Sequence, residues 1–282
     1  MESLLSLSFS NISSRDAVKI RKGLRQIEGL LAQICLSSIK GGSNRRTSVV
    51  DILPTTCKKI DELVEDPAFY EFFRLQDGFE WNVTTHLITC LERLLSMHSN
   101  TANDTLLLSA LNLLQGMLLL HPPSRALFSR EIYMNLLLDL LPPSLPPSIQ
   151  SATLIVLVIA LLDNPQNVRV FEAADGLLAV SALLQDPDTT RMVRSKVLEF
   201  LYFYLLPERD ISPAGSYSTD TARKIPTTGS GSSADLSLTD FDERCILRTG
   251  REKQRLLGRH IESIGELMAE FEESRIFEGA GG

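Results

Sequence analysis

The side chains in this sequence with the strongest claim to chemistry are Cys245 and Arg251, which are separated by five residues. Cysteine phosphatases use this C-x5-R spacing: a thiolate of low pKa attacks a phosphate ester while the arginine holds the phosphate oxygens. Such a loop needs a buried strand before the cysteine and a helix after it. Here a serine- and glycine-rich stretch precedes the motif, Arg244 replaces the usual histidine, and Gly250 is its only glycine. A two-residue match outside its structural context is often accidental, so a cysteine-dependent phosphatase is the alternative hypothesis.

A second pair, His86 and Cys90, stands four residues apart, and on a helix this spacing could supply two zinc ligands. Cys90 also belongs to an apolar stripe, and the sequence suggests no third or fourth ligand. The sequence contains no nucleotide-binding glycine loop, no G-x-S-x-G elbow and no H-E-x-x-H helix. It therefore predicts a protein that is not an enzyme, with no catalytic, cofactor-binding or metal-binding residues and no small-molecule substrate.

Composition and charge indicate the cellular compartment of the protein and exclude some classes of partner. Of the 282 residues 44% are hydrophobic and 22% are charged, as in ordinary globular proteins, and the net charge of −7 argues against binding to nucleic acid. The longest apolar run, 152–162, is shorter than the roughly 20 residues of a membrane span. The four cysteines are widely spaced, and the N-terminus lacks the features of a signal peptide. We therefore expect a cytoplasmic protein with reduced thiols that neither inserts into membranes nor binds nucleic acid.

An internal repeat indicates the fold. The segments that begin at Pro67 and Pro165 align without gaps as P-x5-F-x3-D-G-apolar, and a weaker copy begins at Pro122 with Phe128 at the same offset. The copies start 55 and then 43 residues apart, which brackets the roughly 40–47 residues of armadillo and HEAT units. Proline is tolerated at the first position of a helix, and glycine permits a sharp turn into the next one. The pattern predicts an all-α, armadillo/HEAT-like array of about three three-helix units with capping helices at both ends.

Each unit is expected to hold a short helix opened by the proline and two longer helices. The predicted second helices cover residues 80–97, 132–141 and 178–184, and the predicted third helices cover 105–120, 148–162 and 189–206. The first two of these third helices are apolar almost all round, as expected in the interior of a stack. Upstream, an amphipathic helix over 15–39, capped by Ser13 or Ser14, is expected to close the array, and a helix over 53–64 leads into the first unit.

Composition divides the chain into a helical repeat domain over 1–208, a Ser/Thr/Gly-rich linker over 209–239 that we expect to be disordered, and a C-terminal helix over 240–282 that packs on the array. The last helix of the array is apolar around nearly its whole circumference, so something must cover its outer side. Either the segment 251–271 folds back as a terminal cap, or part of this surface binds a partner. The candidate partner-binding residues are Arg194, Glu199, Tyr202, Phe203 and Leu206.

Three segments resemble the fungal septation initiation network family: 162–177 (LDNPQNVRVFEAADGL), 193–208 (VRSKVLEFLYFYLLPE) and 253–260 (KQRLLGRH). The resemblance runs from the N-terminal helix to about residue 277 and skips the linker. It implies a scaffold or regulatory subunit without catalytic residues, which binds a germinal-centre-class Ser/Thr protein kinase and supports its activity. It also implies action at the spindle pole body in septation and cytokinesis.

That family shares its common name with an unrelated dual-specificity phosphatase, so the resemblance lends no support to the C-x5-R match. A peptide-binding armadillo adaptor is a further alternative, and it differs from the kinase-binding scaffold only in its partner.

Overall fold

The structure is a computed structural model that describes residues 1–37, 56–97, 101–208 and 247–261. In these ranges the chain is built from helices, and the prediction of an all-α fold is confirmed. The only strands in the described ranges are β1 (Leu36–Ser37) and β2 (Thr56–Cys57), which pair antiparallel with Leu36 opposite Cys57. Such a short ladder fastens two segments together and forms no layer of its own.

Helices begin at Pro67, Pro122 and Pro165, the three residues at which the predicted units start. The first unit holds α4 (Pro67–Gln76), α5 (Val83–Ser96) and α6 (Thr101–Leu120); the second holds the 3-10 helix η1 (Pro122–Ser129), α7 (Glu131–Leu138) and α8 (Pro147–Leu161); the third holds α9 (Pro165–Ala173), α10 (Gly176–Gln185) and α11 (Arg191–Leu205). Each opening proline stands in the first turn of its helix, where its missing N–H costs no hydrogen bond. The predicted second and third helices therefore agree with α5, α7 and α10 and with α6, α8 and α11 to within a few residues.

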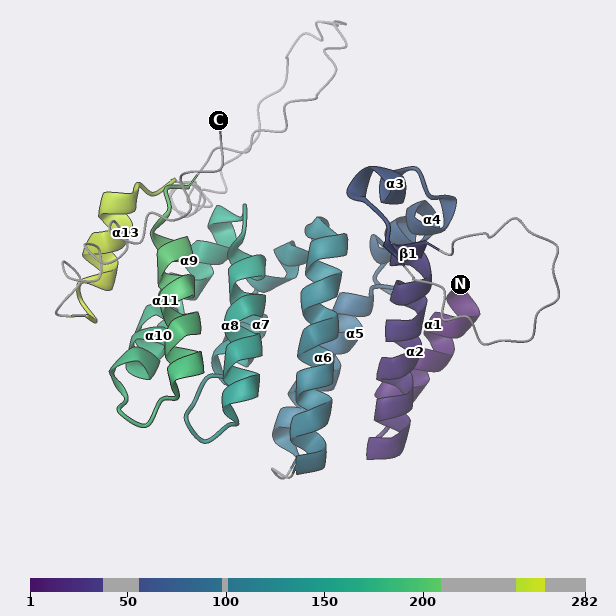
Figure 1. The fold of residues 1–282 in the computed structure, drawn as a ribbon, viewed down its shortest axis with the longest axis horizontal. Coiled ribbons are helices and arrows are strands. Elements are labelled where there is room, and N and C mark those ends of the chain that lie inside the picture. Colours follow the sequence, from purple (N-terminus) through teal and green to yellow (C-terminus); the bar gives the residue numbers. More distant parts are fainter. Residues whose placement is uncertain (38–55, 98–100, 209–246, 262–282) are drawn as a thin grey trace, which may run out of the picture.

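The helices α2, α6, α8 and α11 stand side by side along the molecule (Figure 1). Each packs against the next, and α8, which has neighbours on several sides, is buried over most of its length. Among the described helices α6 alone is long and apolar enough to cross a membrane by length and composition. It packs against α2, α5 and α8, so we place it in the core. The side-by-side stacking is the arrangement of a repeat array, while the specific armadillo assignment stays a prediction.

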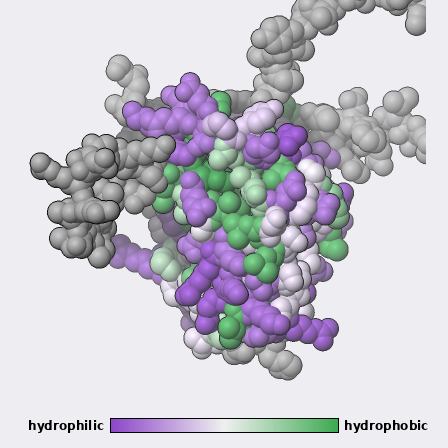
Figure 2. Space-filling model, turned by 90° about the vertical axis from the view of Figure 1, so that its right-hand side faces the viewer, coloured by the Kyte–Doolittle hydropathy of each residue, from purple (hydrophilic) through white to green (hydrophobic). Residues whose placement is uncertain are grey.

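The N-terminal end differs in detail from the prediction. The amphipathic helix α2 (Ala17–Cys35) starts after Asp16, whose carboxylate accepts a hydrogen bond from the N–H of Val18, so the cap is neither Ser13 nor Ser14. An unpredicted helix, α1 (Glu2–Ile12), packs on α2 at Gly23, where an added Cβ would lie 2.6 Å from Ile12 Cγ2. Figure 2 shows apolar side chains gathered on this end of the stack between hydrophilic ones.

The predicted helix over 53–64 is confirmed over residues 60–64 and is wrong over residues 56–59. Residues 56–57 form β2, and α3 (Ile60–Val64) is only five residues long. Lys58 explains the change because its ammonium group donates to the carbonyl oxygen of Ile34 and pairs with Asp66. This bridge ties the segment to the end of α2, and Asp66 in turn caps α4. Residues 53–55 lie outside the described ranges.

The sequence predicts that the glycine of each Asp-Gly pair permits a sharp turn, but the structure gives Gly176 a different role. In the third unit the residue with a left-handed backbone is Asp175, with φ of 56°, and Gly176 is the first residue of α10. A Cβ on Gly176 would lie 2.2 Å from the ring of the buried Phe171. Glycine is therefore needed there for space. In the first unit Asp77 is right-handed, and a Cβ on Gly78 would meet nothing closer than 3.5 Å.

The helix α13 (Gly250–Leu257) lies beside α11 at the C-terminal end of the stack (Figure 1). Leu257 and Ile261 are buried in the same apolar core as the array. The predicted linker, 209–239, and most of the predicted C-terminal region beyond α13 fall outside the described residues. The domain boundaries themselves therefore stay a prediction.

Candidate functional site

The end of α11 and the start of α13 are joined by a short backbone clamp. The N–H of Glu208 donates to the carbonyl oxygen of Arg248 at 3.2 Å, and the N–H of Arg248 donates to a carboxylate oxygen of Glu208 at 2.9 Å. Thr249 then caps α13 in a capping box with Glu252. Since both of these hydrogen bonds join Glu208 to Arg248, the clamp fixes where α13 begins relative to α11.

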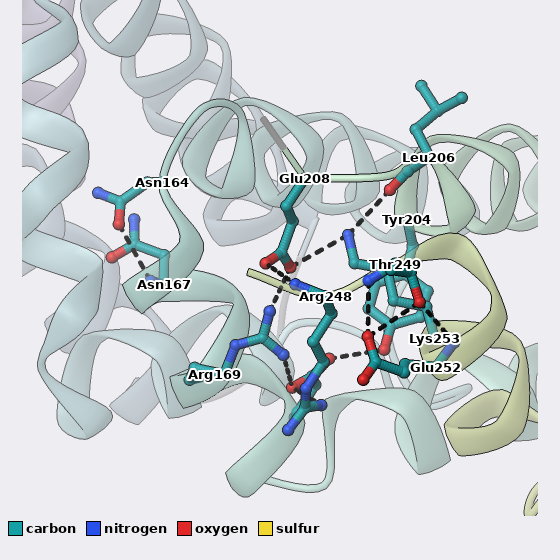
Figure 3. Close-up of polar contacts among 11 residues, drawn as sticks. Asn164, Asn167, Arg169, Tyr204, Leu206, Glu208, Arg248, Thr249, Glu252 and Lys253 are labelled. Atoms are coloured by element: carbon teal, nitrogen blue, oxygen red, sulfur yellow. Dashed lines mark hydrogen bonds and ion pairs between the residues drawn. The ribbon is translucent and has the colours of Figure 1, made fainter. Parts of the chain in front are cut away.

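Five charged side chains surround this clamp and form what we call the ion cluster: Arg169, Glu172, Glu208, Arg248 and Lys253 (Figure 3). Arg169 bridges both glutamates, with 2.6 Å between its guanidinium and Glu172. Arg248 also pairs with Glu172, and Lys253 lies 3.2 Å from Glu208. Apart from Arg248, these side chains are at most 9% exposed. The cluster joins α9, α13 and the segment that follows α11 into one corner.

Burial changes the pKa of both Tyr204 and Lys253, which lie in this corner. The Tyr204 hydroxyl donates to Glu172 at 2.7 Å, and its burial together with the Glu172 charge raises the pKa of the phenol. The Lys253 ammonium lies 5.1 Å from the centre of the Tyr204 ring and donates to the carbonyl oxygen of Leu206. Burial lowers the pKa of Lys253, while the neighbouring Glu208 opposes that shift. Removing one member of the cluster would leave the others buried without compensation.

A pocket of about 250 Å³ opens next to the ion cluster, and we call it the terminal pocket. Its walls come from the end of α8 and the start of α9, from the end of α11 with Pro207 and Glu208, and from Lys253 of α13. It is smaller than the roughly 300–1,000 Å³ that is typical of small-molecule sites. A pocket of this size, apolar on its walls and charged at one side, suits one or two side chains of a protein partner.

Two of the five predicted partner-binding residues, Phe203 and Leu206, line the terminal pocket. Tyr202 is exposed on the same turn of α11. Glu199 is exposed and pairs with Lys196 at 2.5 Å, and Arg194 donates to the carbonyl oxygen of Asp186 at 3.1 Å. Tyr202, Glu199 and Arg194 do not line the pocket, so the structure places two of the five predicted residues in it.

Sequence reasoning missed the ion cluster, although one signal was available. Arg169 and Glu172 are opposite charges three residues apart within an apolar repeat segment, which is unusual for a helix buried in a stack. Lys253 and Glu208 lie in the other two segments that carry the family resemblance. The three segments 162–177, 193–208 and 253–260 thus meet at the terminal pocket.

The structure describes three of the four residues that were considered for chemistry: Arg251, His86 and Cys90. Arg251 is exposed in the first turn of α13, and Cys245 lies outside the described residues. The ring of His86 stacks on Phe9 at 3.7 Å, while Cys90 is buried, and that burial raises the pKa of its thiol. In the described ranges no group of three His, Cys, Asp or Glu side chains could hold a metal ion.

Comparisons with known proteins agree over most of the chain. Residues 1–277 match the family described as "Cell division control protein 14, SIN component". A relative from Schizosaccharomyces pombe, named cell division control protein 14, is 30% identical over 216 residues, which cover 74% of this chain and 80% of the relative. No solved structure matches.

Proposed function

Because the chain belongs to the family of cell division control protein 14, the SIN component, we propose that it is a non-catalytic scaffold that binds a germinal-centre-class Ser/Thr protein kinase and supports its activity. On this proposal it acts in septation initiation and cytokinesis, in the cytoplasm and at the spindle pole body. The kinase and the location come from the family resemblance.

The observation that carries the proposal is the convergence of three distant segments on the terminal pocket. Exposed apolar side chains are found at the end of α11, where Tyr202 is 44% exposed and Leu206, which lines the pocket, is 46% exposed. Aromatic and aliphatic anchors that enter a pocket at the centre of an interface supply most of the binding free energy in protein complexes. We infer that an apolar side chain of the kinase enters the terminal pocket and that Leu206 forms part of its rim.

On this proposal the ion cluster preorganises the terminal pocket in the unbound protein. It holds α13 and the end of α11 in one arrangement, so the wall containing Lys253 and the wall containing Phe203 keep their spacing. A pocket that is already formed loses little conformational entropy when it is filled, which favours affinity. The cluster thus positions the binding surface, and two of its members, Glu208 and Lys253, also line the pocket that the kinase side chain would enter.

Leu206→Asp is expected to weaken co-purification of the kinase at least about tenfold, because a carboxylate at the rim would have to be desolvated when the partner binds. Leu206 is 46% exposed, so the fold should survive the change. The matched control is Leu178→Asp on α10, where the leucine is 52% exposed and does not line the pocket. Affinity purification from the source cells, with quantitation of the kinase per molecule of this protein, measures both variants.

Equal recovery of the kinase with wild type and Leu206→Asp would contradict the terminal pocket as the binding site. Loss of the kinase with both variants would indicate a general effect of added negative charge. The purification of a different protein, in place of a kinase, through Leu206 would favour the peptide-binding adaptor.

The proposal that the protein is not a phosphatase rests on the backbone of the C-x5-R segment. A phosphatase loop points its amide N–H groups at the phosphate, but here the N–H of Arg248 donates to Glu208 and the N–H of Thr249 donates to Glu252 at 2.8 Å. Two carboxylates therefore occupy directions that a phosphate would need, and they would repel it. We expect no hydrolysis of an aryl phosphate by the purified protein, and no difference between wild type and Cys245→Ser. Hydrolysis that disappears in Cys245→Ser would establish the phosphatase instead.

A further inference from the structure

A second concave surface lies between two second helices, α5 and α7, away from the terminal pocket. It is a groove of about 600 Å³, lined by the C-terminal half of α5 and by most of α7. We call it the α5–α7 groove. It shares no residue with the terminal pocket, so whatever occupies it can bind at the same time as a partner at the end of the stack.

The floor of the α5–α7 groove is apolar. Leu136 is almost completely buried beneath it, and Leu95 and Tyr133 are half-buried at its sides. Ile132 is 64% exposed although it is a large aliphatic residue at the start of a short helix. Exposed apolar side chains that line a groove mark binding surfaces more often than isolated exposed residues do.

The rim of the groove is acidic. Glu92 comes from α5, Glu131 is the first residue of α7, and Asp139 follows its last residue. All three carboxylates are exposed, and none of them has an ion pair among the described residues. Arg130 lies at the start of α7, but its guanidinium is placed 5.9 Å from the ring centre of Tyr133 and forms no ion pair with these carboxylates. The groove therefore has an excess of negative charge around an apolar floor.

We propose that the α5–α7 groove binds a basic amphipathic helix of a partner protein. Such a helix would place its apolar side chains on Leu95, Tyr133 and Leu136 and its lysines or arginines beside the carboxylates. Glu131 and Asp139 are eight residues apart, which corresponds to about 12 Å along a helix, so two turns of the partner span the site.

Charge argues against the chain's own C-terminal segment as the occupant. Residues 262–282 contain six glutamates and one arginine, so the acidic rim would repel them. A basic partner meets the opposite situation because each carboxylate without an ion pair gains one. Binding of this kind should also weaken as salt is added, since exposed charges are screened.

The test uses a fluorescent 18-residue helical peptide of leucine and lysine, with all leucines on one face, and follows its binding to the full-length protein by fluorescence anisotropy. Glu92→Lys/Asp139→Lys is expected to weaken binding at least tenfold, and Ile132→Asp is expected to weaken it comparably. The matched control is Glu71→Lys/Glu199→Lys, which makes the same change in net charge at exposed carboxylates outside the groove. It is expected to bind within about twofold of wild type, as is Leu206→Asp.

Thermal unfolding of each variant, followed by circular dichroism, checks that the substitutions leave the protein folded. Equal weakening by the groove and control double variants would overturn the proposal, because it would show attraction to net charge alone. Unchanged binding by Ile132→Asp would overturn it, as would equal binding of a leucine–glutamate peptide. Sedimentation of the wild type as a dimer that Ile132→Asp dissociates would assign the groove to a second copy of the chain and would also overturn it.

Discussion

Replacing Glu208 by alanine will lower the free energy of unfolding by about 3–5 kcal/mol and release α13 from α11, because it removes one partner from a buried ion cluster. The carboxylate of Glu208 contacts Arg169, Lys253 and the N–H of Arg248. Without it, Arg169 and Lys253 remain buried as cations beside the single carboxylate of Glu172. Urea unfolding measures the loss of stability, and amide hydrogen exchange over 250–257 measures the release of α13.

Glu199→Ala is the matched control for this prediction. Glu199 also pairs with a lysine, but its side chain is 57% exposed and its ion pair is screened by water. We expect the free energy of unfolding of Glu199→Ala to differ from that of the wild type by less than about 0.5 kcal/mol. If Glu208→Ala unfolds like Glu199→Ala and its α13 amides exchange no faster, the ion cluster does not hold the C-terminal corner together.

Gly176→Ala is expected to destabilise the protein by about 2–3 kcal/mol, although alanine is normally the better helix former. The added methyl group would lie 2.2 Å from the ring of Phe171, which is completely buried and packs against Phe200 and Tyr204. The ring cannot move without disturbing that packing, so α10 must shift away from α9. Urea unfolding of the purified variant gives the change in stability.

The first unit supplies the control because it has a glycine at the equivalent repeat position. Gly78→Ala places its methyl group 3.5 Å from the nearest atom, at ordinary contact distance. It should change stability by no more than about 0.5 kcal/mol. Similar losses in both variants would mean that backbone conformation, rather than the space beside Phe171, selects glycine in this repeat.

Local signals explain why much of the fold could be predicted from the sequence. Pro67, Pro122 and Pro165 each mark the start of a helix, and Asp66 and Asn164 immediately before two of them cap those helices. Helical periodicity then gives the extent of the longer helices. These signals act over a few residues, so a single sequence reveals them.

The features that were missed depend on contacts between distant residues. The ladder of Leu36 with Cys57 joins residues 21 positions apart, and it stands where the sequence predicts the start of a helix. The pair between Glu172 and Arg248 joins residues 76 positions apart. Phe203 and Leu206 could be proposed as partner residues from their apolar helix, but their pocket needs Lys253 as a wall, and no spacing in the sequence indicates that neighbour.

The side-by-side stack also bears on how the molecule folds. From α1 to α11 most packing joins a helix to one of its near neighbours in the chain, so few long loops must close before these contacts form. Contacts of this kind permit rapid folding that can start in any unit and spread along the stack. The two ends of the stack are different, because Arg248 pairs with Glu172 across 76 positions and Arg93 donates to the carbonyl oxygen of Ile12 across 81 positions. We therefore expect the units from α4 to α11 to assemble first and both ends of the stack to close later, which makes completion of the terminal pocket a late step of folding.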